Sequence, residues 1–315
     1  MHEIALTENE AGMRLDRYLR KLLRTVPLAA IFRQVRQGDI RVDGKRVEPH
    51  LRLQAGMKVQ LKLPSDDLAA VRAAAVRRLV PPPMPAHAPG LPPPVAPVVV
   101  YLDEQVLVVA KPAGLAVHAG SGQRETLTTW IASQRFGVRT AVFSPAPAHR
   151  LDRGTSGLLV IGLTPGSLRG LTKAFRENLV QKVYVAVVHG VPDRDQGSIV
   201  APLLQDPEAD SRDAKVRVDE RGSAARTDYE VVRRGRDMAL VRVVPHSGRQ
   251  HQIRAHLAHI GHTIVGDHRY GSVADVGPGF LLHASDLTFP HPRTGEPKHF
   301  HLPMPREFSR LLDPE

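Results

Sequence analysis

The sequence predicts an α+β protein with two domains. Residues 1–64 begin with two basic amphipathic helices and continue with short strand-like runs. From position 98 the chain contains many short runs of β-branched and aliphatic residues, with few helical segments between them. Residues 65–97 hold the proline-dense segment VPPPMPAHAPGLPPPVAP, which favours an extended, semi-rigid spacer. We therefore expect domains over residues 1–64 and 98–315, joined by a linker that lets them reorient.

Composition restricts the class of protein. The chain has 315 residues, enough for two domains with cores of their own. Its net charge of +11 favours a polyanionic partner such as nucleic acid, although a generally basic proteome would give the same value. It contains no cysteine, which excludes disulfides, iron–sulfur clusters and thiol catalysis. Because it also has no long apolar run and no signal-peptide pattern, we expect a cytoplasmic protein without a membrane segment.

The first domain is predicted to begin with two helices. In the first helix, apolar residues recur with helical spacing on one face: Leu15, Tyr18, Leu19, Leu22 and Leu23. The second helix is predicted to begin at Pro27 and to end at Gly38. Arg33 and Arg36 lie on its outer face. The two helices therefore present apolar faces to a common core and basic faces to solvent.

The rest of the first domain is predicted to be strands. The Asp43-Gly44 turn, with apolar residues on both sides, predicts a hairpin over residues 40–47. Alternating apolar residues over 51–63 predict further strand structure. Together with the segment RQGDIRVDGKRV, this pattern resembles the S4 RNA-binding domain. The resemblance implies that Arg33 and Arg36 contact RNA phosphates, which supply affinity but little sequence recognition; the alternative is a solvated basic face.

The second domain is predicted to be mainly strands. Strands are predicted at 98–101, 106–110, 158–161, 183–188, 198–204, 214–218, 227–232 and 238–244, and helices at 127–136 and 168–178. In the strand at 183–188, Tyr184 lies on the opposite face from Val183 and Val185. At the second helix, Phe175 and Leu179 are expected to face the core.

A polar loop precedes the apolar run at 158–161 in the segment HRLDRGTSGLLV, residues 149–160. Asp152 stands there between two arginines, and Gly154 and Gly157 permit a tight backbone or a positive φ. The run that follows is predicted to be an interior strand. A lone carboxylate on a strained loop that enters a core strand is a candidate catalytic group. The residue pattern alone favours a structural role instead, with Asp152 closing an Asx-turn.

The same segment resembles the signature of the RluA family of RNA pseudouridine synthases, in the branch that acts on large-subunit ribosomal RNA. In that family the aspartate of the HRLD motif is catalytic, which falls on Asp152. LVVAKPAGLAVHAGSG, the Lys-x-Tyr-x-Ala pattern, GRQHQIRAH and FLLHASDLTFPHP resemble the other family motifs. HAGSG and SIVAPLL favour the C type of these enzymes. The resemblance covers nearly all of the chain except the proline-rich linker.

The resemblance also implies roles for other residues. The family tyrosine that stacks on the target base falls on Tyr184, and the arginine that pairs with the catalytic aspartate falls on Arg254. Arg150 corresponds to the side chain that fills the space left by the flipped nucleotide, and Leu282 to the leucine beneath the target base. Arg249 is expected to contact RNA phosphates or the loop. Without the resemblance, Tyr184 and Leu282 would be interpreted as core residues.

The implied fold is a mixed, mostly antiparallel central sheet with flanking helices. The implied reaction converts uridine to pseudouridine in 23S ribosomal RNA, with no metal and no other cofactor, and we expect a monomer. The base must leave its helix to be handled, at a cost of a few kcal/mol. An ion pair with Arg254 would favour the charged form of Asp152. Uridines of other ribosomal RNAs or of transfer RNA are alternative substrates.

Two alternatives belong to other functional classes. The first is a metal-dependent hydrolase, because His256 and His259 are spaced to share one helical face near His251 and His262. However, no carboxylate or cysteine accompanies these histidines nearby, and no HExxH pattern is present. The second alternative is a non-catalytic RNA-binding protein built on the S4-like domain.

Overall fold

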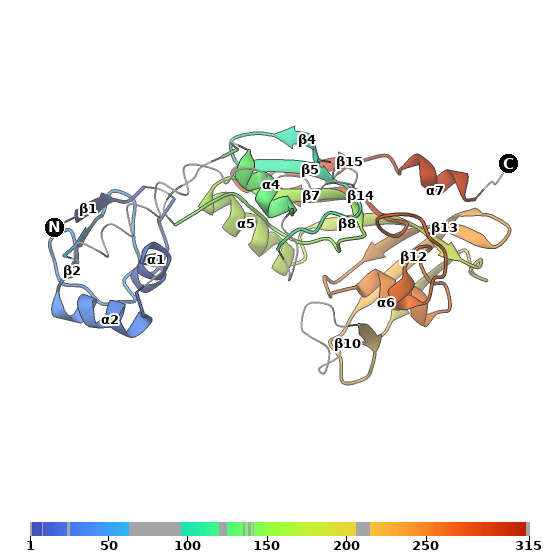
Figure 1. Ribbon diagram of the computed structural model, residues 1–315, viewed down its shortest axis with the longest axis horizontal. Helices are drawn as coiled ribbons and strands as arrows, with labels where there is room; N and C mark the ends of the chain where they lie inside the picture. Colours follow the sequence, from blue (N-terminus) through green and yellow to red (C-terminus); the bar gives the residue numbers. More distant parts are fainter. Residues whose placement is uncertain are drawn as a thin grey trace, which may run out of the picture.

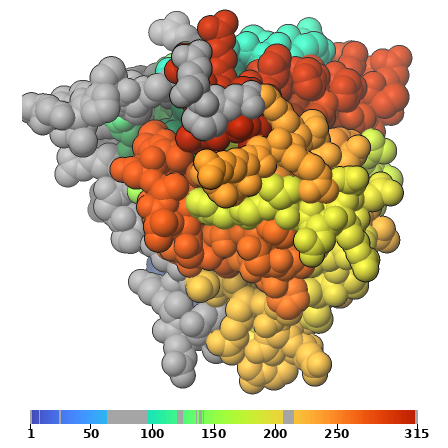
Figure 2. All heavy atoms as spheres, turned by 90° about the vertical axis from the view of Figure 1, so that its right-hand side faces the viewer, coloured from blue at the N-terminus to red at the C-terminus, as the bar shows by residue number. Residues whose placement is uncertain are grey.

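A computed structural model describes residues 2–62 and 96–312, except for positions 8, 24–25, 120–124, 135, 138–139, 141 and 206–214. The proline-rich linker predicted at 65–97 therefore lies almost entirely outside the described residues. Figure 1 shows the N-terminal residues gathered in a small module (blue), beside a larger domain (green to red) built around a long sheet. Figure 2 views the end of the molecule away from this module, and residues of the second half of the chain (yellow to red) cover most of it.

The N-terminal module packs two helices on one small sheet. Helices α1 (Leu15–Leu22) and α2 (Leu28–Gln37) cover strands β1 (His2–Ala5), β2 (Ile40–Val42) and β3 (Lys58–Leu61), in the order β1-β3-β2. The apolar residues predicted for the first helix face are buried in this core: Leu15, Tyr18, Leu19, Leu22 and Leu23. Gly38 ends α2 in the left-handed conformation, as predicted. Arg33 and Arg36 are exposed on the outer side of α2.

The hairpin predicted over residues 40–47 is confirmed at its turn but does not extend beyond Lys45. Asp43 and Gly44 do form a turn, with φ angles of 49° and 76°. Across this turn Val42 and Lys45 exchange backbone hydrogen bonds at 3.1 and 3.0 Å. The described residues directly after Lys45 form no strand, and β2 pairs along its length with β3, with Ile40 opposite Leu61. Strand β1, on the other side of β3, was not predicted. A turn sequence shows where the chain reverses, but the partner of a strand depends on packing with distant residues.

Within the described residues, the larger domain is built on a ten-stranded sheet in the order β4-β5-β7-β14-β8-β13-β12-β9, with β15 beside β14 and β6 beside β7. Its strands are β4 (Val98–Leu102), β5 (Val106–Lys111), β6 (Ala146–Pro147), β7 (Ser156–Gly162), β8 (Gln181–His189), β9 (Gln196–Val200), β12 (Arg226–Arg234), β13 (Met238–Pro245), β14 (Leu282–Pro290) and β15 (Pro297–His301). Only β7 and β14 pair in parallel. The predicted mixed, mostly antiparallel sheet is therefore confirmed.

The remaining elements lie around this sheet. They are α4 (Leu127–Ser133), α5 (Pro165–Arg176), α6 (Gln252–His259), the short 3-10 helix η1 (His268–Tyr270), α7 (Arg306–Arg310), and the separate pair β10 (Leu203–Gln205) and β11 (Val216–Val218). Helix α5 begins earlier than predicted, because Thr164 and Ser167 cap each other's backbone N–H groups. In the part of the chain that the structure covers, no helix has the length and apolar character needed to cross a membrane.

The prediction that Leu179 faces the core is wrong. Leu179 follows the end of α5 and is 57% exposed. The helical pattern does not extend to it, because Asn178 adopts a positive φ of 56° and turns the chain away. Phe175, inside α5, does pack against the core beneath the helix, in agreement with the prediction.

Strand β8 separates two cores. Tyr184, Ala186 and Val188 pack with Leu282 and Ala284 on one face of the sheet. Val185 and Val187, on the other face, pack into a different cluster of apolar residues. The predicted alternation of this strand is therefore confirmed. It places Tyr184 on the same face as the first residues of β14.

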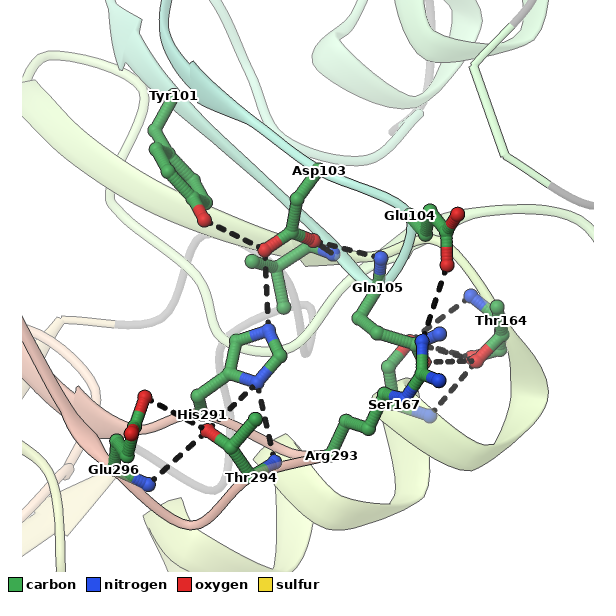
Figure 3. Close-up of polar contacts among 11 residues, drawn as sticks. Tyr101, Asp103, Glu104, Gln105, Thr164, Ser167, His291, Arg293, Thr294 and Glu296 are labelled. Atoms are coloured by element: carbon green, nitrogen blue, oxygen red, sulfur yellow. Dashed lines mark hydrogen bonds and ion pairs between the residues drawn. The ribbon is translucent and has the colours of Figure 1, made fainter.

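The turn between β4 and β5 is tied to the segment after β14 (Figure 3). Asp103 in this turn accepts hydrogen bonds from the Tyr101 hydroxyl at 2.7 Å and from His291 Nε2 at 3.1 Å. Beside it, Arg293 Nη1 lies 3.1 Å from Glu104 Oε2. The contacts of His291 and Arg293 join residues that are almost two hundred positions apart in the chain. They hold the first hairpin of the sheet against its central strand.

The N-terminal module also contacts the larger domain. Val142, which precedes β6, is buried in the core of the module. A groove of about 780 Å³ lies between the two parts, lined on one side by the α1 region and on the other by the start of α5. Arg14, Arg17 and Arg20 line it from the module, and Arg169 lines it from α5. Basic side chains from both parts therefore face one groove.

Candidate active site

A cleft of about 700 Å³ opens in the larger domain, over the ends of β7, β8 and β14 and the start of α6. It is lined by all of the site residues predicted for this domain: Arg150, Asp152, Tyr184, Arg249, Arg254 and Leu282. The other two predicted residues, Arg33 and Arg36, lie on α2 in the N-terminal module and do not line it. Residues from four separate segments of the sequence thus converge on one cleft.

The loop that carries Asp152 is shaped by two glycines. Gly157 has a φ of 114°, and a Cβ atom there would collide with the backbone of Ala284 on β14. Gly154 has no positive φ, but a Cβ atom there would collide with the ring of Phe280. The backbone N–H of Thr155 donates to the carbonyl of Asp152 at 3.1 Å and closes the turn. Glycine is therefore required where the loop enters the sheet beside β14.

The carboxylate of Asp152 is held by a distant partner. Arg254 Nη1 donates to Asp152 Oδ2 at 2.9 Å. The side chain of Asp152 is 18% exposed and that of Arg254 is 7% exposed, so the ion pair is largely buried at the edge of the cleft. This contact argues against the Asx-turn interpretation. It leaves the second carboxylate oxygen available to a bound molecule.

Arg254 is fixed from its other side by Asp267. Its Nε and Nη2 atoms donate to the two oxygens of Asp267 at 2.7 and 2.8 Å, a bidentate pair. The guanidinium also stacks on the rings of Phe280 and Tyr270, with its carbon 4.4 and 5.0 Å from the ring centroids. Burial by itself would lower the pKa of Arg254, but the hydrogen bonds and charges of the two aspartates raise it. The guanidinium is therefore permanently charged.

Tyr184 and Leu282 form the apolar side of the cleft. Tyr184 lies opposite Ala284 across the β8–β14 pair, and Leu282 lies two residues before Ala284 on the same face. Both side chains are largely buried. Burial, and secondarily the charge of Asp152, raise the pKa of the Tyr184 phenol, so it stays neutral. A planar group placed here would have an aromatic ring and an aliphatic side chain beside it.

Several site residues were not found from the sequence. Asp267, which is 1% exposed, has only a weak sequence signal, a single carboxylate in the turn GDHRYG. Lys182 lines the cleft and donates to the carbonyl of Ser247 at 3.3 Å. Its pKa is lowered by burial. His251, just before α6, also lines the cleft, with Nε2 3.9 Å from Asp152 Oδ2.

Lys111 supports the Asp152 loop from beneath. Its ammonium group is buried and donates to the carbonyls of Pro112, Leu115 and Arg153, at 2.9, 2.8 and 3.2 Å. Burial lowers the pKa of Lys111 to about 7, although the nearby charge of Asp152 opposes this shift. The three carbonyls join the turn after β5 to the Asp152 loop. Lys111 thus organises the backbone and lies outside the cleft lining.

The histidines considered as metal ligands are separated in the fold. His256 is fully buried, with Nδ1 2.9 Å from the Thr227 hydroxyl and Nε2 3.0 Å from the Ala201 carbonyl. Both of its ring nitrogens are therefore occupied by protein atoms. His259 is exposed at the other end of α6. Over the described ranges, no group of three or more His, Cys, Asp or Glu side chains is arranged to hold a metal ion.

Comparison with known proteins gives consistent matches. Residues 105–259 match the family model described as RNA pseudouridylate synthase, and residues 13–59 match the S4 domain. The chain is 36% identical over 318 residues to "Ribosomal large subunit pseudouridine synthase C" of Escherichia coli (strain K12), covering 98% of this chain and 95% of that protein. It is 33% identical over 328 residues to the protein of the same name from Pasteurella multocida (strain Pm70), covering 98% and 92%.

Solved structures agree with these matches. "Human RNA Pseudouridylate Synthase Domain Containing 1" superposes with a TM-score of 0.57 at 25% identity, over 72% of this chain and 89% of that one. "Human RNA Pseudouridylate Synthase Domain Containing 4" superposes with a TM-score of 0.54 at 24% identity, over 67% and 90%, which supports the fold alone.

Proposed function

The chain belongs to the RNA pseudouridine synthases, and from this we propose that it isomerises uridines of 23S ribosomal RNA with Asp152 as the catalytic residue. We propose that it does so in the cytoplasm, as a monomer and without a metal or other cofactor. The reaction breaks the bond from ribose C1′ to uracil N1 and forms a bond from C1′ to C5. The proton on C5 leaves, and N1 gains a proton, so the change is an isomerisation.

The observation that carries the proposal is the ion pair between Asp152 and Arg254 at the edge of the cleft. A carboxylate must be ionised to act as a nucleophile or as a base. Arg254 donates a hydrogen bond to the Asp152 carboxylate at 2.9 Å and orients it. Because Arg254 is itself held by Asp267, it keeps this position when the cleft is empty. The pair therefore presents a charged, oriented carboxylate to any nucleotide that enters.

The remaining cleft residues suit a flipped base. Tyr184 would stack on the uracil ring, and Leu282 would pack against it from the same face of the sheet. Arg150 is exposed at the rim of the cleft, where it can take the space that the nucleotide leaves in the RNA. Arg249, also exposed at the rim, would contact phosphates. These contacts offset the cost of taking the base out of its stack, a few kcal/mol.

We further propose a division of labour along the chain. Residues 1–64 form the RNA-binding domain, 65–97 the linker and 98–315 the catalytic domain. Arg33 and Arg36 would contact RNA phosphates from α2. The groove lined by Arg14, Arg17, Arg20 and Arg169 would hold further backbone. The charge of these side chains supports binding of RNA without sequence recognition, and recognition of the target uridine is then left to the cleft.

The test is to map pseudouridine in the ribosomal and transfer RNAs of a strain that lacks this protein. Wild-type protein supplied from a plasmid should restore sites in 23S ribosomal RNA, and Asp152→Asn should restore none. Asp195→Asn, the same change at an exposed carboxylate paired with Arg234, is the matched control and should restore them all. Restoration by Asp152→Asn would refute the catalytic assignment. Sites that disappear only from transfer RNA would correct the substrate.

A further inference from the structure

His251 has an unusual backbone conformation. It immediately precedes α6, with φ 52° and ψ 17°, in the left-handed region that β-carbon-bearing residues seldom adopt. Its side chain is only 8% exposed, yet it lines the cleft. Strained residues of this kind persist where the surrounding structure holds them, and they gather at functional sites. In this conformation the imidazole lies beside Asp152, with Nε2 3.9 Å from Oδ2.

The hydrogen-bond network determines which ring nitrogen of His251 carries the proton. The Tyr270 hydroxyl donates to the Val216 carbonyl at 2.9 Å and accepts from the Val216 N–H at 3.1 Å. Since a hydroxyl has only one hydrogen, it can meet His251 Nδ1, at 3.3 Å, only as an acceptor. Nδ1 therefore carries the hydrogen and donates. Nε2 is left with a free lone pair.

No residue that the structure describes donates to that lone pair. The carboxylate oxygen of Asp152 lies 3.9 Å from Nε2, beyond hydrogen-bond distance, and is itself only an acceptor. Burial lowers the pKa of His251 to about 4, against the raising effect of the Asp152 charge, so the ring is neutral. His251 Nε2 is thus a hydrogen-bond acceptor beside the catalytic carboxylate.

The basic side chains of the cleft do not provide a second hydrogen-bond acceptor. Arg150, Lys182, Arg249 and Arg254 are donors only. The side-chain oxygen of Gln252 already accepts from the Ser247 hydroxyl and from the Arg249 N–H. His251 Nε2 is therefore a neutral acceptor, 3.9 Å from Asp152 Oδ2, for a donor group of the substrate beside that carboxylate.

Within an RNA chain, the uridine sugar and base offer two donors, the ribose 2′-hydroxyl and the uracil N3–H. The 2′-hydroxyl stands on the carbon next to C1′, where the glycosidic bond is broken. N3–H lies on the far side of the base. Building on the proposed function, we propose that His251 Nε2 accepts a hydrogen bond from the 2′-hydroxyl of the target uridine. It thereby positions the ribose against Asp152 and discriminates RNA from DNA at this nucleotide.

The experiment compares the original protein with His251→Asn, His251→Gln and a control variant, on oligonucleotides that differ at one nucleotide. The probe is an RNA oligonucleotide spanning a uridine mapped as above, with uridine or 2′-deoxyuridine at that position alone. Binding is measured in the Asp152→Asn background, so that no substrate is consumed, and single-turnover rates are measured with Asp152 intact. His251→Asn removes the acceptor but tolerates the left-handed backbone. His251→Gln keeps an oxygen near the position of Nε2.

We expect loss of the 2′-hydroxyl to weaken binding by the His251 form about tenfold. His251→Asn should bind the uridine oligonucleotide about tenfold more weakly, and should lose nothing further with 2′-deoxyuridine. His251→Gln should recover part of the preference for uridine. The control is His259→Asn, at an exposed position on the same helix, which should keep the full preference.

Three results would overturn the proposal. One is a His251→Asn form that still prefers uridine by the original factor, which would indicate a purely structural residue. Another is a His251→Asn form that still discriminates against 2′-deoxyuridine but no longer discriminates against N3-methyluridine at the same position. That result would make the uracil N3–H the donor. The third is a His251→Gln form without any recovery, if its melting temperature matches that of His251→Asn. Failure of the proposed function gives a distinct result: the protein without any substitution would then form no pseudouridine in the uridine oligonucleotide.

Discussion

Arg254 and Asp152 stand 102 positions apart in the chain and meet through one 2.9 Å hydrogen bond. Arg254 makes two further bonds, both of them to Asp267, which is the more deeply buried of the two carboxylates. The position of the guanidinium is therefore determined mainly by Asp267. Arg254 in turn orients Asp152, and Arg254 would keep its position even if Asp152 were absent.

Asp267→Asn should slow the reaction although Asp267 does not line the cleft. The amide offers one oxygen in place of two, so one N–H group of Arg254 loses its partner and Asp152 alone balances the buried charge. Breaking a buried pair costs about 3–5 kcal/mol. Because the amide keeps one hydrogen bond to Arg254, the loss of stability should be smaller than this. Denaturant unfolding and single-turnover rates provide the measurements. Asp275→Asn, in an exposed turn nearby, is the control. An Asp267→Asn enzyme with the original rate and stability would contradict this role.

Arg254→Ala should reduce turnover far more than Arg249→Ala. Without Arg254, the carboxylates of Asp152 and Asp267 remain partly buried and unpaired, at a cost of about 3–5 kcal/mol. Arg249 is exposed, and its Nε donates only to the Ala224 carbonyl, at 3.3 Å. The comparison needs single-turnover rates at saturating RNA for both forms. Equal losses would show that the wrong arginine has been assigned.

Deleting residues 1–64 should weaken RNA binding more than it slows the chemical step. For each interaction with an RNA phosphate that the deletion removes, the slope of log affinity against log salt should decrease by about 0.7 to 0.9. The measurements are affinity at several salt concentrations and the rate at saturating RNA.

The deletion also exposes Val142, which is buried in the core of the module, so a second form is required. Substituting Arg33 and Arg36 by alanine in the full chain should lower the slope without this exposure. An unchanged slope in both forms would show that the module does not contact the RNA backbone. A saturating rate at background level would show that the module helps to build the cleft.

Removal of divalent metals from the enzyme should leave its activity unchanged. Both ring nitrogens of His256 already have protein partners, and the charge on Asp152 is balanced by Arg254. The enzyme is dialysed against EDTA and the chelator is removed before RNA is added, so that RNA folding is not disturbed. Activity that disappears after dialysis and returns with zinc would revive the histidine hypothesis.

Much of the fold was predictable because it rests on local patterns. The alternation of β8 correctly placed Tyr184 on one face, and the glycine-flanked apolar run correctly predicted β7 as an interior strand. The pairing partners of the strands were harder to predict. β1 and the pairing of β2 with β3 depend on residues well separated in the chain, and the Asp43-Gly44 turn favoured a nearer partner.

The site could be predicted in part for a similar reason. Asp152, Tyr184 and Arg254 stand in motifs that resemble those of a known family, and they do line one cleft. Asp267 could not be found, because a single acidic residue in a turn has many structural uses. His251 was considered only as a metal ligand. Its role as an acceptor depends on Tyr270 and Val216, whose contacts with one another appear only in the folded chain.

The position of β14 has a consequence for how this protein is made. β14 begins at Leu282, late in the chain, yet it lies between β7 and β8 at the centre of the sheet. While the chain leaves the ribosome, β4, β5 and β7 can pair with one another, and β8, β13, β12 and β9 can do the same. The two halves have no strand to join them until β14 emerges. Long-range pairing of this kind is slow and leaves strand edges open. A nascent chain stopped before Leu282 would contain Asp152, Tyr184 and Arg254, and would still have no cleft in which to bring them together.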